Sequence, residues 1–384
     1  MAATVAPFRV EVSDATLDDL RRRLDGARFP EPLPGAGWDY GTDHAFLRDL
    51  VEYWRDGYDW RATEARLNRL EHGITDLDGQ SVHFLHVRSP VPGALPLVLT
   101  HGWPGSIVEF LDVIGPLTDP AAHGGQPGDA FHVVCPSLPG YAFSGPTHDR
   151  GWDPGRIARA WAELMRRLDY RQYGAQGGDW GSFVTSQLAL ADPEHVVGIH
   201  LNMIAPNPGG DDPSSFADDE RDAMAAFAHY MDDDGGYLKI QSTRPHTLGF
   251  ALDDSPVGLC AWIVEKFRGW SDCDGDPERS FTKDQLLDNI MLYWVTGTAT
   301  SSVRLYAEFD RALRAGRLPF GARIDVPTGY ARYPKEIMRT SRRWAERNHN
   351  LVHFAALPRG GHFAAMEQPA LFVDDVRACF RSMR

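Results

Sequence analysis

The first 70 residues carry apolar positions at helical spacing. Ser13 can cap a first helix, prolines 30, 32 and 34 are expected to end it, and a third helix is predicted over 60–70. The apolar faces of the first two helices are Leu17, Leu20 and Leu24, then Phe46, Leu47, Leu50, Val51 and Trp54. We therefore predict a helical N-terminal arm, residues 1–70, that packs on the core behind it.

From residue 71 the pattern changes to short apolar runs. Asp78-Gly79 lies between two of them and is a hairpin signal. The predicted strands are 75–77, 81–87, 95–100, 131–135, 173–175 and 196–201. An amphipathic helix over 157–168 is one of those expected between strands. Strands that alternate with helices predict an α/β class with a mostly parallel central sheet and helices on both faces.

The alternation is interrupted after the sixth predicted strand. Residues 205–296 have helical patterns with Asp/Gly loops, and we expect them to form a helical lid over the C-terminal edge of the sheet. The α/β pattern resumes with strands at 324–328 and 351–357 and a closing helix at 371–380. The predicted organisation is arm 1–70, core 71–204, lid 205–296 and core 297–384.

The composition of the chain excludes some classes of binding partner. The chain has 384 residues, of which 43% are hydrophobic and 24% charged, and a net charge of −14. The acidic balance, without a basic block, argues against nucleic acid and anionic membranes. No apolar run reaches the roughly 18 residues of a membrane span, and the four cysteines have no metal-like spacing. We expect a reduced, cytoplasmic protein.

The stretch 176–182 supplies the first candidate for chemistry. A short strand, a glycine turn and a helix are the context of a nucleophile elbow, whose apex is exposed above a parallel sheet. Here the apex is Asp179, between Gly177 and Gly181. A carboxylate at the positive end of a helix stays ionised and can attack carbon. The alternative is an aspartate that only caps the helix.

A histidine and a second acid complete the pattern. His362 follows a glycine pair after the last predicted strand, so chain order places the nucleophile first and the base last, as in an α/β-hydrolase triad. The acid should follow strand 324–328. Asp325 lies too early, and Glu336 in the next loop is the better candidate; a solvated loop glutamate is the alternative.

The segment 101–105 follows an early strand, where a second oxyanion donor is expected. The backbone N–H groups of Trp103 and Trp180 are the predicted oxyanion hole. Pro104 has no N–H and fixes the turn. His101 is interpreted as a structural histidine and not as a base.

The chain resembles the microsomal-type epoxide hydrolases of the α/β-hydrolase superfamily, as a soluble bacterial member. The resemblance spans nearly the whole length, including the N-terminal arm. The motifs that carry it are 101–106, 178–181, 236–245, 254–259, 291–294, 326–329 and 359–365. The vertebrate members have an N-terminal membrane anchor, which we do not expect here.

The resemblance implies that Asp179 is the nucleophile, His362 the base and Glu336 its orienting acid. It also implies that the lid tyrosines Tyr237 and Tyr306 donate hydrogen bonds to the epoxide oxygen. The expected reaction converts a small-molecule epoxide to a vicinal diol through an aspartyl ester, with no metal and no organic cofactor. Either detoxification or natural-product biosynthesis fits this activity. Whether the protein forms a homodimer is left open by the sequence.

Two other functions are compatible with an aspartate elbow. A haloalkane or haloacid dehalogenase also uses one, and Trp180 suits its halide site, but it leaves the two tyrosines and the arm unexplained. A non-catalytic binding protein of the same fold should have lost a triad member, whereas all three are present. A serine esterase is disfavoured because Ser182 follows the apex.

Overall fold

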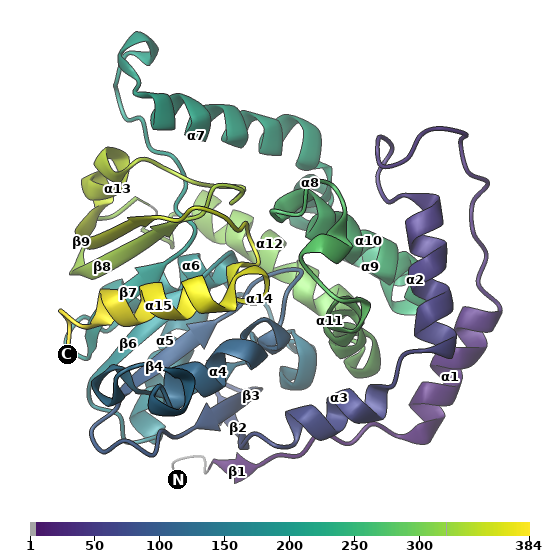
Figure 1. Ribbon diagram of the computed structural model, residues 1–384, viewed down its shortest axis with the longest axis horizontal. Helices are drawn as coiled ribbons and strands as arrows, with labels where there is room; N and C mark the ends of the chain where they lie inside the picture. Colours follow the sequence, from purple (N-terminus) through teal and green to yellow (C-terminus); the bar gives the residue numbers. More distant parts are fainter. Residues whose placement is uncertain (1–4, 320) are drawn as a thin grey trace.

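In the computed structural model, which describes residues 5–319 and 321–384, a nine-stranded sheet runs through the molecule (Figure 1). Its order is β1-β2-β3-β5-β4-β6-β7-β8-β9. The strands are β1 Ala6–Pro7, β2 His72–Leu77, β3 Gln80–Val87, β4 Leu95–Thr100, β5 Phe131–Pro136, β6 Tyr173–Gly177, β7 Val196–Leu201, β8 Ile324–Arg332 and β9 His349–Ala356.

The sheet is antiparallel at one edge and parallel beyond it. β1, β2, β3 and β5 pair antiparallel, and the pairs from β5 through β4, β6, β7 and β8 to β9 are parallel. Asp78 and Gly79 join β2 to β3 with φ of 53° and 80°, and positive φ at both positions is what a two-residue hairpin requires. The predicted hairpin and the mostly parallel sheet are confirmed.

The register of the two central strands positions the site. β4 and β6 are parallel neighbours, with Thr100 opposite Gly177 at their carboxyl ends. The apolar run Leu97, Val98 and Leu99 in β4 is fully buried, as expected of a strand covered on both faces. The loops that follow both strands therefore leave the same edge of the sheet, where open α/β sheets bind their ligands.

Helices cover both faces of the sheet. α5 and α6 pack together behind it in Figure 1, and α4 and α15 pack together in front. These helices are α4 Leu111–Thr118, α5 Pro154–Arg167, α6 Trp180–Ala191 and α15 Pro369–Phe380. Two short helices, α13 Arg342–Asn348 and α14 Ala364–Glu367, lie in the loops of the last strands. The predicted helix over 157–168 is α5.

The segment between β7 and β8 is helical, as predicted. It contains α7 Asp218–His229, a π-helical turn Tyr230–Asp234, α8 Gly236–Thr243, α9 Pro245–Asp254, α10 Pro256–Trp270, α11 Lys283–Thr296 and α12 Ala299–Arg314. α12 starts after the predicted boundary at 296, but it packs against α8 and α9. It therefore belongs spatially with the inserted helices.

The N-terminal arm contains α1 Asp14–Asp25, α2 His44–Asp56 and α3 Trp60–Leu67. Ser13 caps α1 as predicted, but the helix ends at Gly26, before the prolines. α1 and α2 lie against α10, and α2 and α3 against α11. The arm thus packs mainly on the inserted helices, whereas we expected it to pack on the core. β1, which the sequence pattern does not predict, joins the sheet edge.

Several strand boundaries differ from the predicted ones. β2 begins at His72 rather than 75, and β6 continues to Gly177 rather than ending at 175. β8 continues to Arg332 rather than ending at 328, and β9 begins at His349 rather than 351. The sequence pattern did not predict the end of β8 because Gly329 interrupts the apolar run. Tyr330 and Ala331, which follow Gly329 in the strand, are nevertheless fully buried. Glu336 still follows the strand, as the prediction requires.

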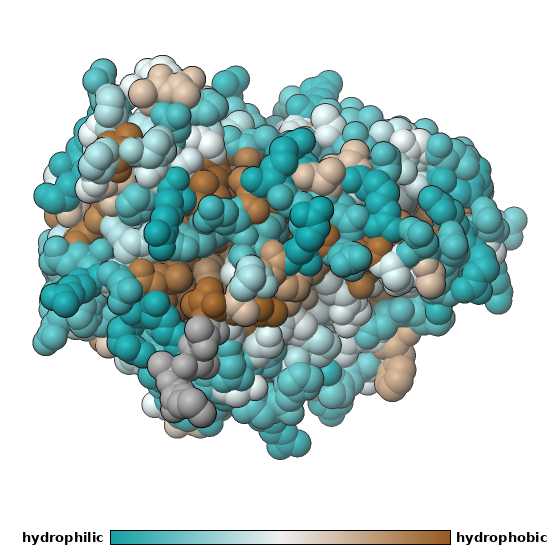
Figure 2. Space-filling view, turned by 90° about the horizontal axis from the view of Figure 1, so that it is seen from below, coloured by the Kyte–Doolittle hydropathy of each residue, from teal (hydrophilic) through white to brown (hydrophobic). Residues whose placement is uncertain are grey.

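The surface agrees with the acidic composition. On the face shown in Figure 2, hydrophobic residues form separate groups within a mostly hydrophilic surface. None of the helices within 5–319 and 321–384 has the length and apolar character needed to cross a bilayer. The four cysteines, Cys135, Cys260, Cys273 and Cys379, are free and buried.

Candidate active site

Asp179 stands at a strained turn between β6 and α6. Its backbone has φ of 51° and ψ of −129°, a region that side chains with a Cβ rarely adopt and that costs about 1–3 kcal/mol. Such strain is tolerated where the surrounding structure imposes it. The two flanking glycines show how tightly the turn is packed.

Gly177 and Gly181 have no room for a side chain. A Cβ at Gly177 would lie 2.1 Å from the Gly181 carbonyl oxygen, and one at Gly181 would lie 1.9 Å from the carbonyl oxygen of Thr100. Both atoms belong to the backbone, so they cannot move aside cheaply. The glycines therefore let α6 start directly behind the end of β4, and this holds Asp179 above the sheet.

The Asp179 carboxylate does not cap α6. The helix has no side-chain cap at this residue, and Oδ1 instead accepts a 2.7 Å hydrogen bond from the backbone N–H of Trp103. The capping alternative is therefore wrong. One of the two predicted oxyanion donors contacts the candidate nucleophile, and Trp180 begins α6 directly after it. The role of the Trp180 N–H stays a prediction.

His362 joins the two carboxylates. Its Nε2 lies 3.3 Å from Oδ2 of Asp179, and its Nδ1 lies 2.7 Å from Oε1 of Glu336. The three residues follow β6, β8 and β9, parallel strands of one sheet whose carboxyl ends lie at the same edge. The His362 N–H also donates to the Trp270 carbonyl, which ties the histidine loop to α10. The structure thus brings the three predicted residues together.

The charges around His362 favour its protonated form. Burial lowers the pKa of the imidazole, but the nearby carboxylates of Glu336 and Asp179 outweigh this and hold the pKa well above its usual value. Glu336 is fully buried, and its Oε1 also accepts from the Ile337 N–H. A buried carboxylate fixed in this way can orient the ring and stabilise its cation.

Tyr237 and Tyr306 face the same centre from α8 and α12. Both are buried, with ring centroids 5.8 Å apart. Tyr237 stacks on Trp103 at 5.1 Å, and Tyr306 meets Trp180 edge-on at 4.7 Å. Burial raises the pKa of both phenols well above the usual value. The two hydroxyls therefore stay protonated and remain hydrogen-bond donors.

Sequence reasoning missed two aromatic residues at this centre. The Tyr230 hydroxyl lies 2.7 Å from the Tyr237 hydroxyl, and the Trp270 ring packs on Tyr237 at 5.3 Å and on His362 at 5.0 Å. Tyr230 begins the π-helical turn before α8, a feature often found at functional sites. No motif marks either residue in the sequence, because only the packing of the inserted helices brings them here.

Residues rejected on sequence grounds have other roles. The His101 ring is buried, with Nε2 accepting from the Leu138 N–H and Nδ1 next to the Gly102 carbonyl; burial lowers its pKa to about 4. This confirms a structural histidine. Ser182 donates to the Gly177 carbonyl, and the exposed Asp325 pairs with Arg323.

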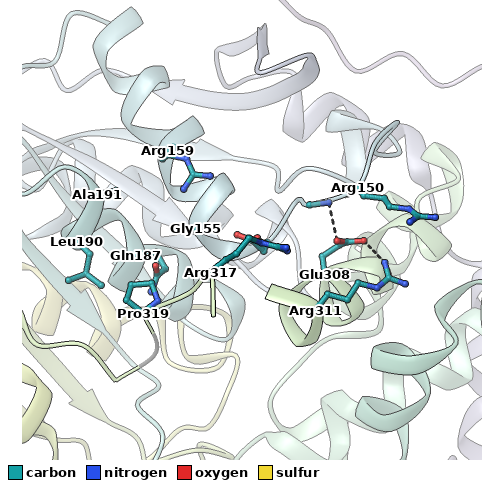
Figure 3. A pocket seen from close by; sticks show the side chains of 12 residues that line it. Arg150, Gly155, Arg159, Gln187, Leu190, Ala191, Glu308, Arg311, Arg317 and Pro319 are labelled. Atoms are coloured by element: carbon teal, nitrogen blue, oxygen red, sulfur yellow. Dashed lines mark hydrogen bonds and ion pairs between the residues drawn. The ribbon is translucent and has the colours of Figure 1, made fainter. Parts of the chain in front are cut away.

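A surface pocket elsewhere is lined by arginines. Four of them, Arg150, Arg159, Arg311 and Arg317, surround it between α5, α6 and α12 (Figure 3). Glu308 in this pocket accepts from the Gly151 N–H and from Arg311. Because Glu308 follows Tyr306 on α12, these bonds anchor the helix that carries the tyrosine. The predicted catalytic residues do not line this pocket.

Two family models match the chain. The family described as "Epoxide hydrolase N terminus" matches residues 5–110, and the "alpha/beta hydrolase fold" matches residues 96–236. The first match includes the arm and the Trp103 loop, and the second includes the elbow. The predicted α/β-hydrolase fold is confirmed.

Relatives extend the similarity over the whole chain. A Stigmatella aurantiaca protein named "Putative epoxide hydrolase" is 49% identical over 99% of this chain and 86% of its own length. Epoxide hydrolase 1 of Sus scrofa is 38% identical, covering 97% and 88%.

Solved structures agree with these relatives. The epoxide hydrolase of Aspergillus niger has a TM-score of 0.88 at 33% identity, with 100% of this chain and 97% of that chain covered. The juvenile hormone epoxide hydrolase of Bombyx mori has a TM-score of 0.85 at 32% identity, covering 100% and 94%.

Proposed function

The chain belongs to the epoxide hydrolases, and we propose that it opens its epoxide through a covalent ester on Asp179. The activity itself, conversion of a small-molecule epoxide to a vicinal diol, follows from the family. One observation carries the proposed mechanism. The Asp179 carboxylate stands at a strained turn, 3.3 Å from a histidine held by a second carboxylate and beside two buried phenols.

In the first step Asp179 attacks one carbon of the epoxide. A bond forms between its carboxylate oxygen and that carbon, and the carbon–oxygen bond of the ring breaks. Tyr237 and Tyr306 donate hydrogen bonds to the oxygen that becomes an alkoxide. The alkoxide takes one proton from a tyrosine hydroxyl, so the product of this step is a hydroxyalkyl ester of Asp179. The proton that His362 releases next restores the tyrosine.

Ester formation prepares His362 for the second step. Asp179 loses its negative charge, so one of the two carboxylates that raise the His362 pKa is removed. The histidine then releases its proton, which balances the one gained by the alkoxide, and becomes a neutral base. Electrostatics thus supply the base only after the nucleophile has reacted.

In the second step His362 takes a proton from water, and the water oxygen bonds to Cγ of the Asp179 ester. We propose that the N–H groups of Trp103 and Trp180 hold the tetrahedral oxyanion. Collapse breaks the bond between Cγ and the alkyl-bearing oxygen, which takes the proton back from His362. The diol leaves, and the acid formed on Asp179 gives its remaining proton to His362, which restores both the carboxylate and the protonated histidine.

A single turnover in heavy-oxygen water tests this mechanism. With enzyme in excess over styrene oxide, the diol should be largely unlabelled and the label should appear in the peptide that contains Asp179. The reason is that the oxygen added to carbon comes from the carboxylate, and water enters only at Cγ. Mass spectrometry of diol and peptides is the measurement.

The peptide that contains the exposed Asp325 is the internal control and should stay unlabelled. Later turnovers carry the label into the diol, so they do not discriminate. A fully labelled diol in the first turnover, with an unlabelled Asp179 peptide, would mean that water attacks the epoxide directly.

Replacing either tyrosine with phenylalanine should slow ring opening. Losing one donor to a developing oxyanion costs about 2–4 kcal/mol, or on the order of 10²–10³-fold in rate. The remaining tyrosine can partly compensate, so Tyr237→Phe and Tyr306→Phe are expected to be milder than the double change. The measurement is the rate of ester formation after rapid mixing. Tyr40→Phe is the control, since Tyr40 is 84% exposed.

An unaltered rate of ester formation in the double variant would remove both tyrosines from the mechanism. It would also favour the dehalogenase alternative, which uses the same nucleophile without a phenol pair. The relatives and solved structures described above are named epoxide hydrolases, which favours epoxide hydrolysis over dehalogenation.

Cytoplasmic location and a homodimeric state are part of the proposal. Four free, buried cysteines support a reducing compartment. Either detoxification or natural-product biosynthesis would use this activity. The division into arm 1–70, core 71–204, lid 205–296 and core 297–384 is likewise proposed.

A further inference from the structure

Glu109 is a carboxyl group beside the active site for which the mechanism above has no role. It lies in the 3₁₀ turn Ile107–Phe110, between the Trp103 loop and α4. Together with Asp179 and His362 it lines a small cavity of about 10 Å³, measured as space for the centre of a water. A volume of roughly 10–15 Å³ on this measure is what one buried water needs.

The Glu109 side chain is directed back along the Trp103 loop. A Cβ at Gly105 would lie 1.6 Å from its Oε1, so the glycine makes room for the carboxyl group. The backbone of Ser106 also forms a hydrogen bond with it, and His362 is the cation that acts on it. Glu109 therefore approaches the catalytic centre from the loop that supplies the Trp103 N–H.

The same cavity contains an acceptor without a partner. Gln176 is 1% exposed, and its Nε2 donates to Oδ1 of Asn202. Its Oε1 is buried and has no hydrogen-bond partner, although the residue lines the cavity. A buried acceptor left unpaired is costly, and a buried water makes two to four hydrogen bonds. Glu109, His362 and Gln176 supply that number.

Besides Asp179, the cavity is lined by residues of α14 and α15. Its walls include Phe372 of α15 and Ala364 and Ala365 of α14, but neither Tyr237 nor Tyr306. The alkyl group of the ester is expected on the tyrosine side, where the epoxide oxygen is held. Water in the cavity can therefore reach Cγ without displacing it.

Burial keeps Glu109 neutral near pH 7. Desolvation raises its pKa to about 8, with the carboxylates of Asp179 and Glu336 adding to the increase and His362 opposing it. Cys135 of β5 and Tyr293 of α11 also interact electrostatically with Glu109. Burial raises the pKa of both groups well above the usual value. A neutral carboxyl still accepts a hydrogen bond through its carbonyl oxygen.

We propose that Glu109 is a positioning residue that holds the hydrolytic water of the ester-cleavage step. The inference rests on the proposed ester of Asp179. The water donates one O–H to Glu109, and its second O–H turns from Oε1 of Gln176 to Nε2 of His362 once the histidine is neutral, which directs a lone pair at Cγ. The water oxygen bonds to Cγ and its proton moves to His362, which returns it to the departing diol oxygen. Glu109 keeps its own proton throughout.

The test separates the two chemical steps. Glu109→Leu and Glu109→Gln are mixed rapidly with styrene oxide, and intact mass follows formation and loss of the ester. For Glu109→Leu we expect ester formation within about twofold of wild type and hydrolysis slowed by on the order of 10–100-fold, as for a misplaced reactant. Glu109→Gln should restore most of the hydrolysis rate, because its amide oxygen accepts the same bond.

Each other outcome overturns the inference. Hydrolysis at the wild-type rate in Glu109→Leu removes Glu109 from water positioning. Equal slowing of both steps shows that it only supports the Trp103 loop, which holds the nucleophile. If Glu109→Leu does not fold, Glu109→Met serves, since its flexible side chain fills similar space. If neither wild type nor His362→Gln forms any ester, the covalent mechanism fails, and this result differs from all those above.

Discussion

Replacing Asp179 with asparagine is expected to abolish diol formation while leaving the fold intact. The amide is not a nucleophile at carbon, so no ester can form; loss of a catalytic nucleophile costs at least about 10⁴-fold in kcat. Asparagine has nearly the same shape, tolerates a positive φ, and can still accept the Trp103 N–H. The measurements are diol formation from styrene oxide and thermal unfolding.

Asp325→Asn is the matched control, because it makes the same change at an exposed carboxylate near the start of β8. It should keep wild-type activity. Deamidation would regenerate the aspartate, so the mass of Asp179→Asn is checked before and after the assay. Full activity in a protein that still carries the amide would remove Asp179 from the mechanism.

His362→Gln is expected to trap the ester. Only the second step needs a base, so ring opening should continue while hydrolysis slows by about 10²–10⁴-fold, the usual contribution of a general base. Intact mass after mixing with styrene oxide should show the protein plus one epoxide. No atom is lost in ring opening, so the increase equals the full mass of the substrate.

His195→Gln provides the control, since the half-exposed His195 side chain forms an ion pair with Asp192. It should turn over normally and accumulate no adduct. Normal turnover of His362→Gln without an adduct would contradict the role of His362. Absence of both turnover and adduct would place the histidine in the first step instead.

Much of the site was predictable from the sequence because its signals are local. The hairpin at Asp78-Gly79 follows from the φ values those residues accept. The elbow requires glycines at 177 and 181, since a Cβ at either would overlap backbone. Asp179, Glu336 and His362 follow β6, β8 and β9, and a parallel sheet brings the carboxyl ends of these strands to one edge.

Other features were decided only by packing between distant segments. That α1 and α2 lie on α10 could not be predicted, because an apolar helix face indicates burial without naming its partner. Asp179 was compatible with capping α6 until Trp103, 76 residues away in sequence, proved to be its hydrogen-bond donor. A side chain's choice among partners depends on which donors the tertiary structure brings within reach.

Apart from β1, the sequence by itself determined the main elements, their order and the three residues of the proposed triad, because these depend on backbone preferences and strand order. Tertiary structure alone placed Tyr230, Trp270 and Glu109 around them. None of these belongs to a local pattern. Burial keeps Glu109 neutral, and the neighbouring carboxylates keep His362 cationic. Both effects come from segments far apart in the chain and exist only once those segments have packed.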